Sequence, residues 1–327
     1  MQKIKAGIIG GAGYTGGELL RLLLLHPAVQ VAFVQSESQA GKPVAAVHTD
    51  LLGETNLQFS AAHSAEVDVL FLCGGHGAAR TFLTANNLPP EVVVIDLSHD
   101  FRHANNNSIG NRKFVYGLAE LNREQIKRAD SIANAGCFAM AIQLALLPLA
   151  QAGKLSGEIH VNATTGSTGA GQSLSATSHF SWRSNNQSVY KAFEHQHLQE
   201  IGESLQSLQP GFDGEILFVP QRGAFTRGIL ASVYLTTTLN AEELVALYQS
   251  YYAGHPFVLI CDKEVDVKQV VNTNRCFLHL ARHGNRVLIT SVIDNLLKGA
   301  CGQAVQHMNL IFGLEETTGL KLKPSAF

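Results

Sequence analysis

The sequence predicts an α/β fold built from two domains, and three observations lead to this prediction. The chain has 327 residues, more than one hydrophobic core usually organises. Up to residue 137, near-continuous apolar strands alternate with helices, as they do in doubly wound parallel sheets. Beyond that point the strands alternate apolar and polar side chains and outnumber the helices. This second pattern predicts an α+β domain with a mixed or antiparallel sheet.

The elements of the first domain follow from short apolar runs bounded by glycine and proline. We expect, in chain order, a strand at 4–9, a helix at 18–26, strands at 29–35 and 67–73, a helix at 77–86 and a strand at 91–98. The first helix ends before Pro27 because proline cannot continue a helix beyond its first turn. Polar residues 103–113 predict an exposed loop.

The second domain begins with a long apolar helix. We expect a helix at 138–150 that Pro148 ends or kinks, a strand at 157–165, a polar stretch to about 210, strands at 215–221 and 229–239, a helix at 241–253, and strands at 275–283 and 286–294. A final helix over 296–314 is expected to return to the first domain. The predicted domains are therefore 1–137, joined by the C-terminal segment 296–327, and 138–295.

Composition and charge exclude several classes of partner. The chain is 46% apolar and 15% charged, and its formal net charge is −2. Nucleic acids and anionic membranes attract basic patches, so neither is expected as a partner. No segment has the apolar length of a membrane span, and the N-terminal apolar piece is too short for a signal peptide. Five scattered cysteines without a CxxC pair predict a cytoplasmic protein with no disulfide framework and no metal site.

A glycine-rich turn joins the first strand to the first helix. Residues 10–16 read GGAGYTG, and such glycines let the backbone approach a pyrophosphate. The helix that follows offers unpaired N–H groups and the positive end of its dipole to the phosphates. The sequence therefore predicts a Rossmann-type dinucleotide-binding domain. The residues expected to contact the cofactor here are Gly10, Gly11, Gly13, Tyr14, Thr15 and Gly16.

The end of the second strand bears on which dinucleotide binds. Sites for NAD usually place an acidic residue there, to hold the ribose 2′-hydroxyl. Ser36, Ser38 and Lys42 instead suit a 2′-phosphate, while Glu37 keeps the NAD alternative open. We expect NADP, with Ser36 and Ser38 as contacts. His76 follows the third strand at the sheet edge where ligands bind in such folds, and is a further candidate.

Two motifs of the second domain are ambiguous by themselves. Residues 166–173, GSTGAGQS, nearly match the phosphate loop of nucleoside triphosphatases, but Gln172 replaces the lysine that neutralises the phosphates. A nest of N–H groups for a small anion and an ordinary surface connection both remain open. His195 and His197 would share a face on a strand, and each can be an acid–base catalyst or a structural residue.

Motifs along nearly the whole chain resemble the N-acetyl-gamma-glutamyl-phosphate reductase family of arginine biosynthesis, which is related to aspartate-semialdehyde dehydrogenase. The motifs that carry the resemblance are GIIGGAGYTGGELLRLLLLHP (7–27), IDLSHDFR (95–102), VYGLAELNR (115–123), IANAGC (132–137), GSTGAG (166–171), HQHLQEI (195–201), TRGIL (226–230) and DNLLKGACGQAVQ (294–306). The resemblance implies NADPH-dependent reduction of an acyl phosphate to a semialdehyde and inorganic phosphate, by a homodimer or homotetramer.

The same resemblance assigns roles to individual residues. A lone cysteine is usually a small core residue, but the family pattern makes Cys137 the nucleophile, and the start of a helix stabilises a thiolate there. It implies an acid–base role for His195, with His197 the alternative, and a nicotinamide-side contact for Asn295. The residues it implies for substrate or phosphate binding are Ser98, Arg102, Asn134, Gly166, Ser167, Gly169 and Arg227.

The sequence departs from the family pattern at two positions. Gln196 replaces an arginine and Gln221 a histidine, and we expect both where the acyl-glutamate is held. The choice between N-acetyl and N-succinyl substrates therefore stays open. Three other functions are also weighed. One is aspartate-semialdehyde dehydrogenase or a related acyl-phosphate reductase, the second is a non-catalytic dinucleotide sensor, and the third is a cysteine hydrolase, which leaves the glycine turn unexplained.

Overall fold

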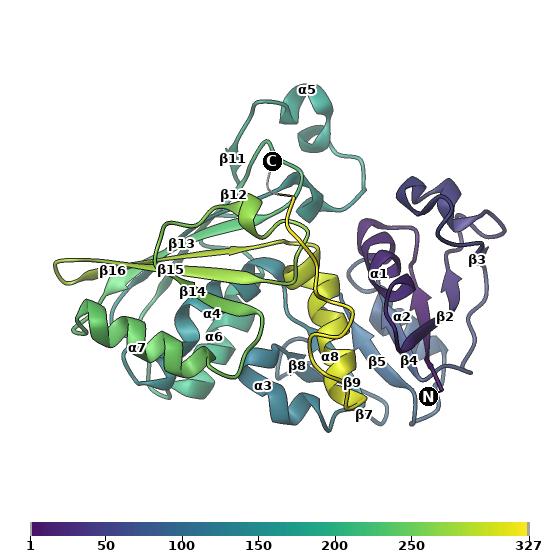
Figure 1. Ribbon diagram of the computed structural model, residues 1–327, viewed down its shortest axis with the longest axis horizontal. Coiled ribbons are helices and arrows are strands. Elements are labelled where there is room, and N and C mark those ends of the chain that lie inside the picture. The colour runs from purple at the N-terminus through teal and green to yellow at the C-terminus, as the bar shows by residue number, and fades with distance from the viewer. Residues whose placement is uncertain (1, 326–327) are drawn as a thin grey trace. The chain divides into compact units, whose positions relative to one another are not determined.

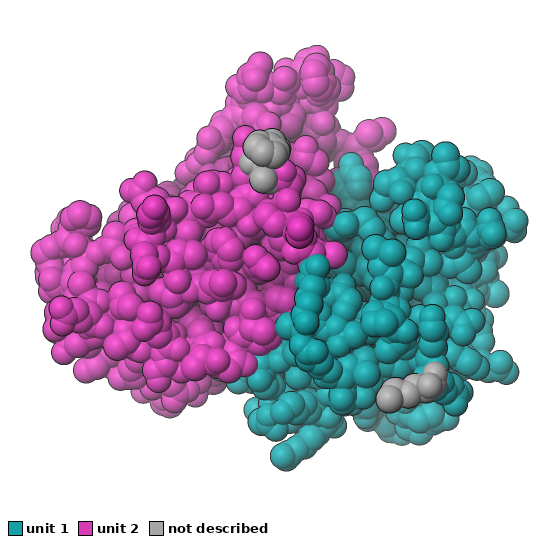
Figure 2. Space-filling model, in the orientation of Figure 1, with its two compact units in different colours: residues 1–135, 300–321 teal, residues 136–299, 322–327 magenta. Residues whose placement is uncertain are grey.

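The computed structural model describes residues 2–325, which form two compact units (Figures 1 and 2). Unit 1 contains residues 1–135 and 300–321, and unit 2 contains residues 136–299 and 322–327. Met1 and residues 326–327, which the predicted domain limits include, lie outside the described residues. No helix within residues 2–325 combines the length and the apolar character needed to cross a bilayer.

Unit 1 is built on a seven-stranded sheet in the order β3-β2-β1-β4-β5-β9-β8, and every neighbouring pair in it is parallel. Its strands are β1 (Ile4–Ile9), β2 (Val29–Gln35), β3 (Phe59–Ser60), β4 (Val69–Leu72), β5 (Val93–Asp96), β8 (Val115–Gly117) and β9 (Ser131–Asn134). The central strands are apolar on both faces because helices cover the sheet, as in other parallel sheets. The predicted doubly wound α/β fold is confirmed.

The helices of unit 1 come from both ends of the chain. They are α1 (Tyr14–Leu24), α2 (Ala78–Ala85), α3 (Ala119–Ile126) and α8 (Gly302–Ile311), and α8 packs against α1 and α3. The final helix was expected over 296–314 without interruption. It begins instead with a π-helical turn, Leu297–Cys301, a form that commonly marks functional sites. Residues 103–113 are not all loop, since β6 (Ser108–Ile109) and β7 (Arg112–Lys113) form a hairpin there.

Unit 2 is built on a mixed sheet in the order β11-β12-β10-β13-β16-β15-β14. Its strands are β10 (Ile159–Thr165), β11 (Ser188–Val189), β12 (Ile216–Arg222), β13 (Ile229–Thr236), β14 (Val258–Cys261), β15 (Cys276–His283) and β16 (Arg286–Ile293). The pairs β10–β12 and β14–β15 are parallel and the other pairs are antiparallel, so the predicted mixed sheet is confirmed.

The longer helices of unit 2 lie on one face of this sheet (Figure 1). They are α4 (Cys137–Gln151), α6 (His197–Leu208) and α7 (Ala241–Tyr252), and the short helix α5 (Phe180–Arg183) belongs to an excursion before β11. Along β10, residues 159, 161, 163 and 165 are buried, while the residues between them are partly exposed. One face of the sheet therefore packs against the helices, and the alternation fixes which side chains share that face.

Pro148 does not end helix α4, which was one of the two outcomes expected from the sequence. The helix continues to Gln151, although proline has no N–H to donate to the carbonyl of Leu144. The hydroxyl of Tyr252 on α7 donates to that carbonyl at 2.5 Å, and Tyr248 donates to the carbonyl of Ala145. Tertiary hydrogen bonds from α7 therefore replace the missing helical one, which the local sequence could not reveal.

Candidate functional site

The glycine turn of unit 1 has the geometry that a pyrophosphate requires. Gly10 has a φ of +76°, and a Cβ there would lie 2.9 Å from the backbone nitrogen of Gly74. A Cβ at Gly16 would lie 2.5 Å from the carbonyl oxygen of Gly11, whereas the space around Gly13 is open. Gly13 also caps α1 without any side-chain hydrogen bond to the first turn. The residues present therefore fit a dinucleotide, whose phosphates would take the N–H groups at the start of α1.

The residues expected to face the ribose lie just beyond β2. Ser36 is buried and Ser38 is exposed, and their hydroxyl oxygens are 3.5 Å apart. Lys42 donates to the side chain of Gln39 at 3.0 Å, and Glu37 is exposed. Two hydroxyls and a lysine thus stand within a seven-residue stretch at the carboxyl end of β2, as the sequence suggested for a 2′-phosphate.

Other predicted residues of unit 1 make internal contacts. Ser98 donates to the buried carboxylate of Asp96, and burial raises the pKa of Asp96 to about 6. Arg102 donates to the carbonyl of Asn134 at 2.8 Å, and Asn134 donates to the carbonyl of Ala300 at 3.2 Å. These three predicted substrate contacts, Ser98, Arg102 and Asn134, are at most 8% exposed, so their bonds within unit 1 order its loops.

His76 behaves differently from these buried residues. It is exposed beyond β4, and the centroid of its ring lies 3.9 Å from that of His99. Its accessibility at the carboxyl edge of the parallel sheet is what a cofactor contact needs.

Cys137 is the first residue of α4, as the family resemblance implied. Gly136 caps the helix in an extended conformation, and its N–H donates to the carboxylate of Glu200 at 3.0 Å. The thiol is partly buried and forms no disulfide. The free N–H groups and the dipole at the start of a helix stabilise a thiolate at this position, which is what a nucleophilic cysteine requires.

The two histidines lie at the start of α6 rather than on a strand. The turn before the helix brings their rings together, with centroids 4.6 Å apart, and both side chains are buried. Phe193, at a φ of +64°, donates its N–H to the carbonyl of Phe218 at 2.8 Å. Such a φ is costly for a bulky residue, and strain of this kind is typical of functional sites. The strained turn directs His195 toward the aromatic cluster described next.

His195 packs among rings that border the cysteine. Its ring centroid is 5.5 Å from Phe138, 5.4 Å from Phe218 and 5.8 Å from Tyr190. Burial, followed by the charge of Lys191, lowers the pKa of His195 to about 4, so the imidazole is neutral at physiological pH. Its Nδ1 accepts the N–H of His197 at 3.2 Å. The proton of the neutral ring is therefore on Nε2, which makes His195 a hydrogen-bond donor at that atom.

Three residues of this cluster were missed in the sequence. Glu200 is almost fully buried, and its carboxylate lies 3.7 Å from Nε2 of His197 as well as accepting from Gly136. Burial raises the pKa of Tyr190 to about 12, and the charge of Cys137 adds to this, so the phenol stays neutral at physiological pH. Arg222 lies over the Tyr190 ring at 4.9 Å from its centroid. The sequence contained a signal for Glu200, which follows His197 by about one helical turn. It contained no such signal for Tyr190 or Arg222.

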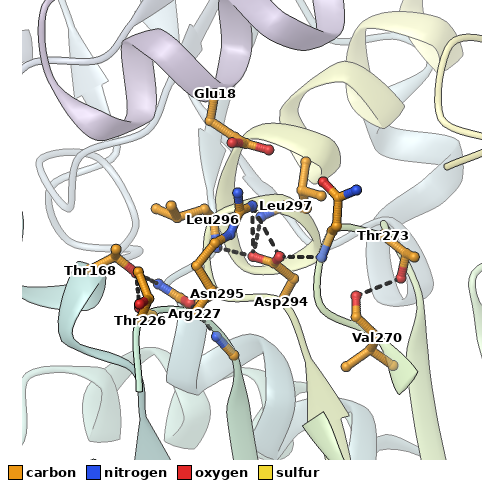
Figure 3. Close-up of polar contacts among 12 residues, drawn as sticks. Glu18, Thr168, Thr226, Arg227, Val270, Thr273, Asp294, Asn295, Leu296 and Leu297 are labelled. Carbon is orange, nitrogen blue, oxygen red and sulfur yellow. Dashed lines mark hydrogen bonds and ion pairs between the residues drawn. The ribbon is translucent and has the colours of Figure 1, made fainter. Parts of the chain in front are cut away.

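A second polar cluster of unit 2 surrounds Asp294 and Asn295 (Figure 3). Arg227 reaches the fully buried carboxylate of Asp294 at 3.0 Å. Asn295 accepts the N–H of Gly228 at 2.7 Å and donates to the hydroxyl of Thr168 at 3.0 Å. The side chain of Asn295 therefore ties the loop before β13 to the loop after β10, in addition to any contact with a cofactor.

The GSTGAG loop uses its own N–H groups for structure. The N–H groups of Gly166, Ser167 and Thr168 donate to the carbonyls of residues 228, 225 and 226, and a Cβ at Gly166 would lie 2.4 Å from the carbonyl oxygen of Thr226. These donors are unavailable to an anion, so the nest that the sequence suggested does not form from them. A Cβ at Gly169 would lie 3.1 Å from the hydroxyl oxygen of Thr165, so the loop packs closely against Thr165 at this glycine.

The two glutamines that depart from the family pattern are more exposed than His195 and His197. Gln196 is exposed, although both of its neighbouring histidines are buried. Gln221 accepts from Gln187 and from the hydroxyl of Thr164, its partner across the β10–β12 ladder. Strand alternation places Gln221 on the face opposite Phe218 and Arg222. That these glutamines hold the acyl-glutamate stays a prediction.

Comparison with known proteins agrees with the division into two units. A family model described as the NAD binding domain of semialdehyde dehydrogenase matches residues 5–129, and one for the dimerisation domain of the same enzymes matches residues 137–295. Among residues 2–325, no group of three or more His, Cys, Asp or Glu side chains is arranged to hold a metal ion.

Solved structures share the fold. Aspartate semialdehyde dehydrogenase II from Vibrio cholerae, complexed with ASA, superposes with a TM-score of 0.73 at 17% identity, over 96% of this chain and 99% of that one. The same enzyme from Candida albicans, with NADP, has a TM-score of 0.65 at 15% identity, over 95% of this chain and 99% of that one. At these identities the likeness shows the fold alone.

Curated relatives are much closer in sequence. N-acetyl-gamma-glutamyl-phosphate reductase from Flavobacterium johnsoniae is 56% identical over 324 residues, which is 99% of this chain and 100% of that protein. The enzyme of that name from Bacteroides thetaiotaomicron is 55% identical over 325 residues, with the same coverage. Identity of this extent, over both units and their motifs, shows that the chain belongs to the N-acetyl-gamma-glutamyl-phosphate reductase family.

Proposed function

We propose that this protein reduces an N-acyl-γ-glutamyl phosphate to the N-acyl-glutamate 5-semialdehyde, releasing inorganic phosphate, with NADPH as the reductant. The observation that carries the proposal is the placement of Cys137 at the start of α4, in a chain 56% identical to a curated reductase of this name. The structural neighbours named aspartate semialdehyde dehydrogenase, at 17% identity, share the fold and do not bear on the substrate.

The chain's own residues suit each step of this chemistry. The Cys137 thiolate attacks the acyl carbon, the carbon–oxygen bond to phosphate breaks with its electrons, and a thioester remains on the sulfur. When bound, NADPH supplies the hydride that reduces this thioester. Nε2–H of neutral His195 stabilises the negative oxygen that forms on the former acyl carbon, as donors in other sites stabilise oxyanions. Collapse of the carbon–sulfur bond then releases the aldehyde and restores the thiolate.

Substrate and cofactor contacts follow the geometry of each unit. Gly10, Gly13 and Gly16 fit the pyrophosphate, and Ser36, Ser38 and Lys42 support NADP as the cofactor. Arg227 is our candidate for the α-carboxylate of the substrate, because a guanidinium held by Asp294 presents a fixed fork to a carboxylate. Arg102 remains the candidate for the phosphoryl group, and Asn295 the candidate for the nicotinamide side.

The assembly and setting are part of the same proposal. A homodimer or homotetramer is supported by the dimerisation-domain match over residues 137–295, and sedimentation at micromolar concentration distinguishes the two. A cytoplasmic setting is supported by the five cysteines, which form no disulfide within residues 2–325.

The decisive test is NADP⁺ reduction in the oxidative direction. Phosphate would be supplied with N-acetyl-glutamate semialdehyde, N-succinyl-glutamate semialdehyde or aspartate semialdehyde in parallel, with Cys137→Ser as the control. We expect phosphate-dependent turnover of one or both N-acyl substrates and none in the mutant. Turnover of aspartate semialdehyde alone would replace the proposed substrate. If the folded protein binds NADP but turns over none of these substrates, the proposed enzyme activity is wrong and a dinucleotide sensor is the better assignment.

A further inference from the structure

Arg222 lies at the end of β12 on the face that carries the catalytic cluster. Residues 218, 220 and 222 share that face by strand alternation, and the Phe218 ring lies 5.3 Å from Phe138 and 5.4 Å from His195. The Arg222 guanidinium lies 4.9 Å from the centroid of Tyr190, and the charges of both Arg222 and Cys137 influence this phenol. Arg222 thus contacts a phenol on which the charge of Cys137 also acts.

The charge of Arg222 is not neutralised within the protein. Among residues 2–325, no carboxylate forms an ion pair with Arg222, with the adjacent Arg183 or with Lys191, whereas Arg227 has Asp294. The Nε of Arg222 is buried and has no hydrogen-bond acceptor within the same residues. A partly buried guanidinium with an unused donor and no counter-ion is costly unless a ligand supplies the missing charge.

Arg183 fixes this arrangement. It is 8% exposed, and its Nη1 donates to the carbonyls of Arg222, at 2.8 Å, and of Asn186. Its Nε and Nη2 donate to the carbonyl of Thr177, and Nη2 also donates to the Ser188 hydroxyl. Most hydrogen bonds of Arg183 therefore go to backbone carbonyls. Its positive charge adds to that of Arg222 because no carboxylate within residues 2–325 pairs with it. Lys191, whose charge also acts on His195, adds a third positive group.

We propose that Arg222, anchored by Arg183 and Tyr190, forms an anion subsite that binds an oxyanion of the substrate other than the α-carboxylate assigned to Arg227. This inference rests on the proposed function. An acyl-glutamyl phosphate offers two such oxyanions. One is the phosphoryl group, for which Arg102 is the other candidate, and the second, if the acyl group is dicarboxylic, is the carboxylate at its far end. A guanidinium suits either, because its fork matches carboxylate and phosphate oxygens alike.

The test compares Arg222→Met with Arg282→Met, which removes the same charge from β15 of the same unit, where Arg282 donates to the carbonyl of Leu239. Oxidative-direction kinetics would be measured for phosphate and for the N-acetyl and N-succinyl semialdehydes. We expect KM to rise about 10- to 100-fold in Arg222→Met, as the loss of a charged hydrogen bond implies. A rise for phosphate with both substrates assigns the phosphoryl group, and a rise for the N-succinyl substrate alone assigns the acyl carboxylate. KM values unchanged for all three would overturn the subsite.

A second readout does not depend on the proposed reaction. Alkylation of Cys137 by iodoacetate, which is anionic, is compared with alkylation by neutral iodoacetamide, and the ratio of the two rates reports the local cationic charge. We expect the ratio to fall about tenfold in Arg222→Met and to stay within about twofold of wild type in Arg282→Met. An unchanged ratio in both variants would contradict the subsite even in an enzyme of another specificity. If no semialdehyde is turned over but the ratio of alkylation rates still falls in Arg222→Met, only the proposed function is contradicted.

Discussion

Gly299 packs directly against Cys137. A methyl group added at Gly299 would lie 2.8 Å from the Cβ of Cys137 and 3.3 Å from its Cα. The N–H of Gly299 donates to the carbonyl of Asp294 at 2.9 Å, which closes the π-helical turn around this contact. The backbone of the turn at Gly299 thus packs against the first residue of α4.

Gly299→Ala should therefore displace the thiol. The added methyl group meets the first residue of α4 and has no flexible side chain to push aside, so Cys137 itself must shift. We expect kcat to fall about 100-fold, as misplacement of a reacting atom by about 1 Å can cause. The matched control is Gly202→Ala on α6, where no atom lies within 4 Å of the added methyl group, and where about 1 kcal/mol of helix stabilisation is expected. Equal activity of both variants would contradict the contact.

Glu200 should position the catalytic turn without touching substrate. Its carboxylate joins the N–H of Gly136 to His197 and raises the pKa of His195 against the effect of burial. In Glu200→Gln we expect kcat to fall about 10- to 100-fold, with KM for substrate and cofactor within about threefold of wild type. Glu203→Gln on the same helix serves as the control. A change in KM alone would point to substrate binding instead.

The sequence predicted most strands and the parallel sheet because buried strands are continuous apolar runs between glycines and prolines. It missed α6, although Leu198, Ile201 and Leu205 recur at helical spacing, since the polar residues around them obscured the pattern. The π-helical turn was also missed, because the glycine at 299 is explained only by a residue 162 positions earlier, Cys137.

The candidate site shows the same division between local and long-range information. Cys137 and the glycine turn depend on a strand and a helix adjacent in sequence, so motifs reveal them. Tyr190 and Arg222 meet because β11 pairs with β12, residue 188 opposite residue 222, which no local pattern encodes. The orientation of Gln221 likewise follows from its ladder with β10, which chain position alone does not reveal.

The buried imidazole of His195 should make the protein sensitive to acid. Its pKa is about 4 in the folded protein and close to its ordinary value of 6.5 when unfolded. Between these values the unfolded chain binds the additional proton, so this stability is complete above pH 6.5 and is lost as the pH falls toward 4. Urea unfolding would measure the free energy of unfolding at pH 6.5 and at pH 4. We expect the decrease between these pH values to be smaller in His195→Gln than in wild type, by at most about 3 kcal/mol. His160→Gln, at a partly exposed site, should keep the wild-type dependence.

Lys42 should favour NADP over NAD. Its ammonium group and the Ser36 and Ser38 hydroxyls stand where a 2′-phosphate is expected. In Lys42→Met we expect KM for NADP⁺ to rise about tenfold while KM for NAD⁺ changes less than twofold, since only NADP⁺ carries the phosphate. Lys263→Met, in unit 2, controls for the change in total charge. A similar rise for both cofactors would place Lys42 outside the 2′-phosphate site.

Asp294 should hold Arg227 in its substrate-binding orientation. Its buried carboxylate accepts from Arg227 and from the N–H groups of Asn272, Leu296 and Leu297, at 2.7 to 3.2 Å (Figure 3). An asparagine has one acceptor oxygen and no charge, so Asp294→Asn removes the ion pair with Arg227 and leaves part of the turn without its acceptor. We expect the free energy of unfolding to fall by about 3–5 kcal/mol and KM for the semialdehyde to rise at least tenfold. Arg227→Met should raise KM similarly. The loss of unfolding free energy in the double variant should be smaller than the sum of the losses in the two single variants, because both changes remove the same interaction. Additive costs would show that Asp294 supports the turn alone.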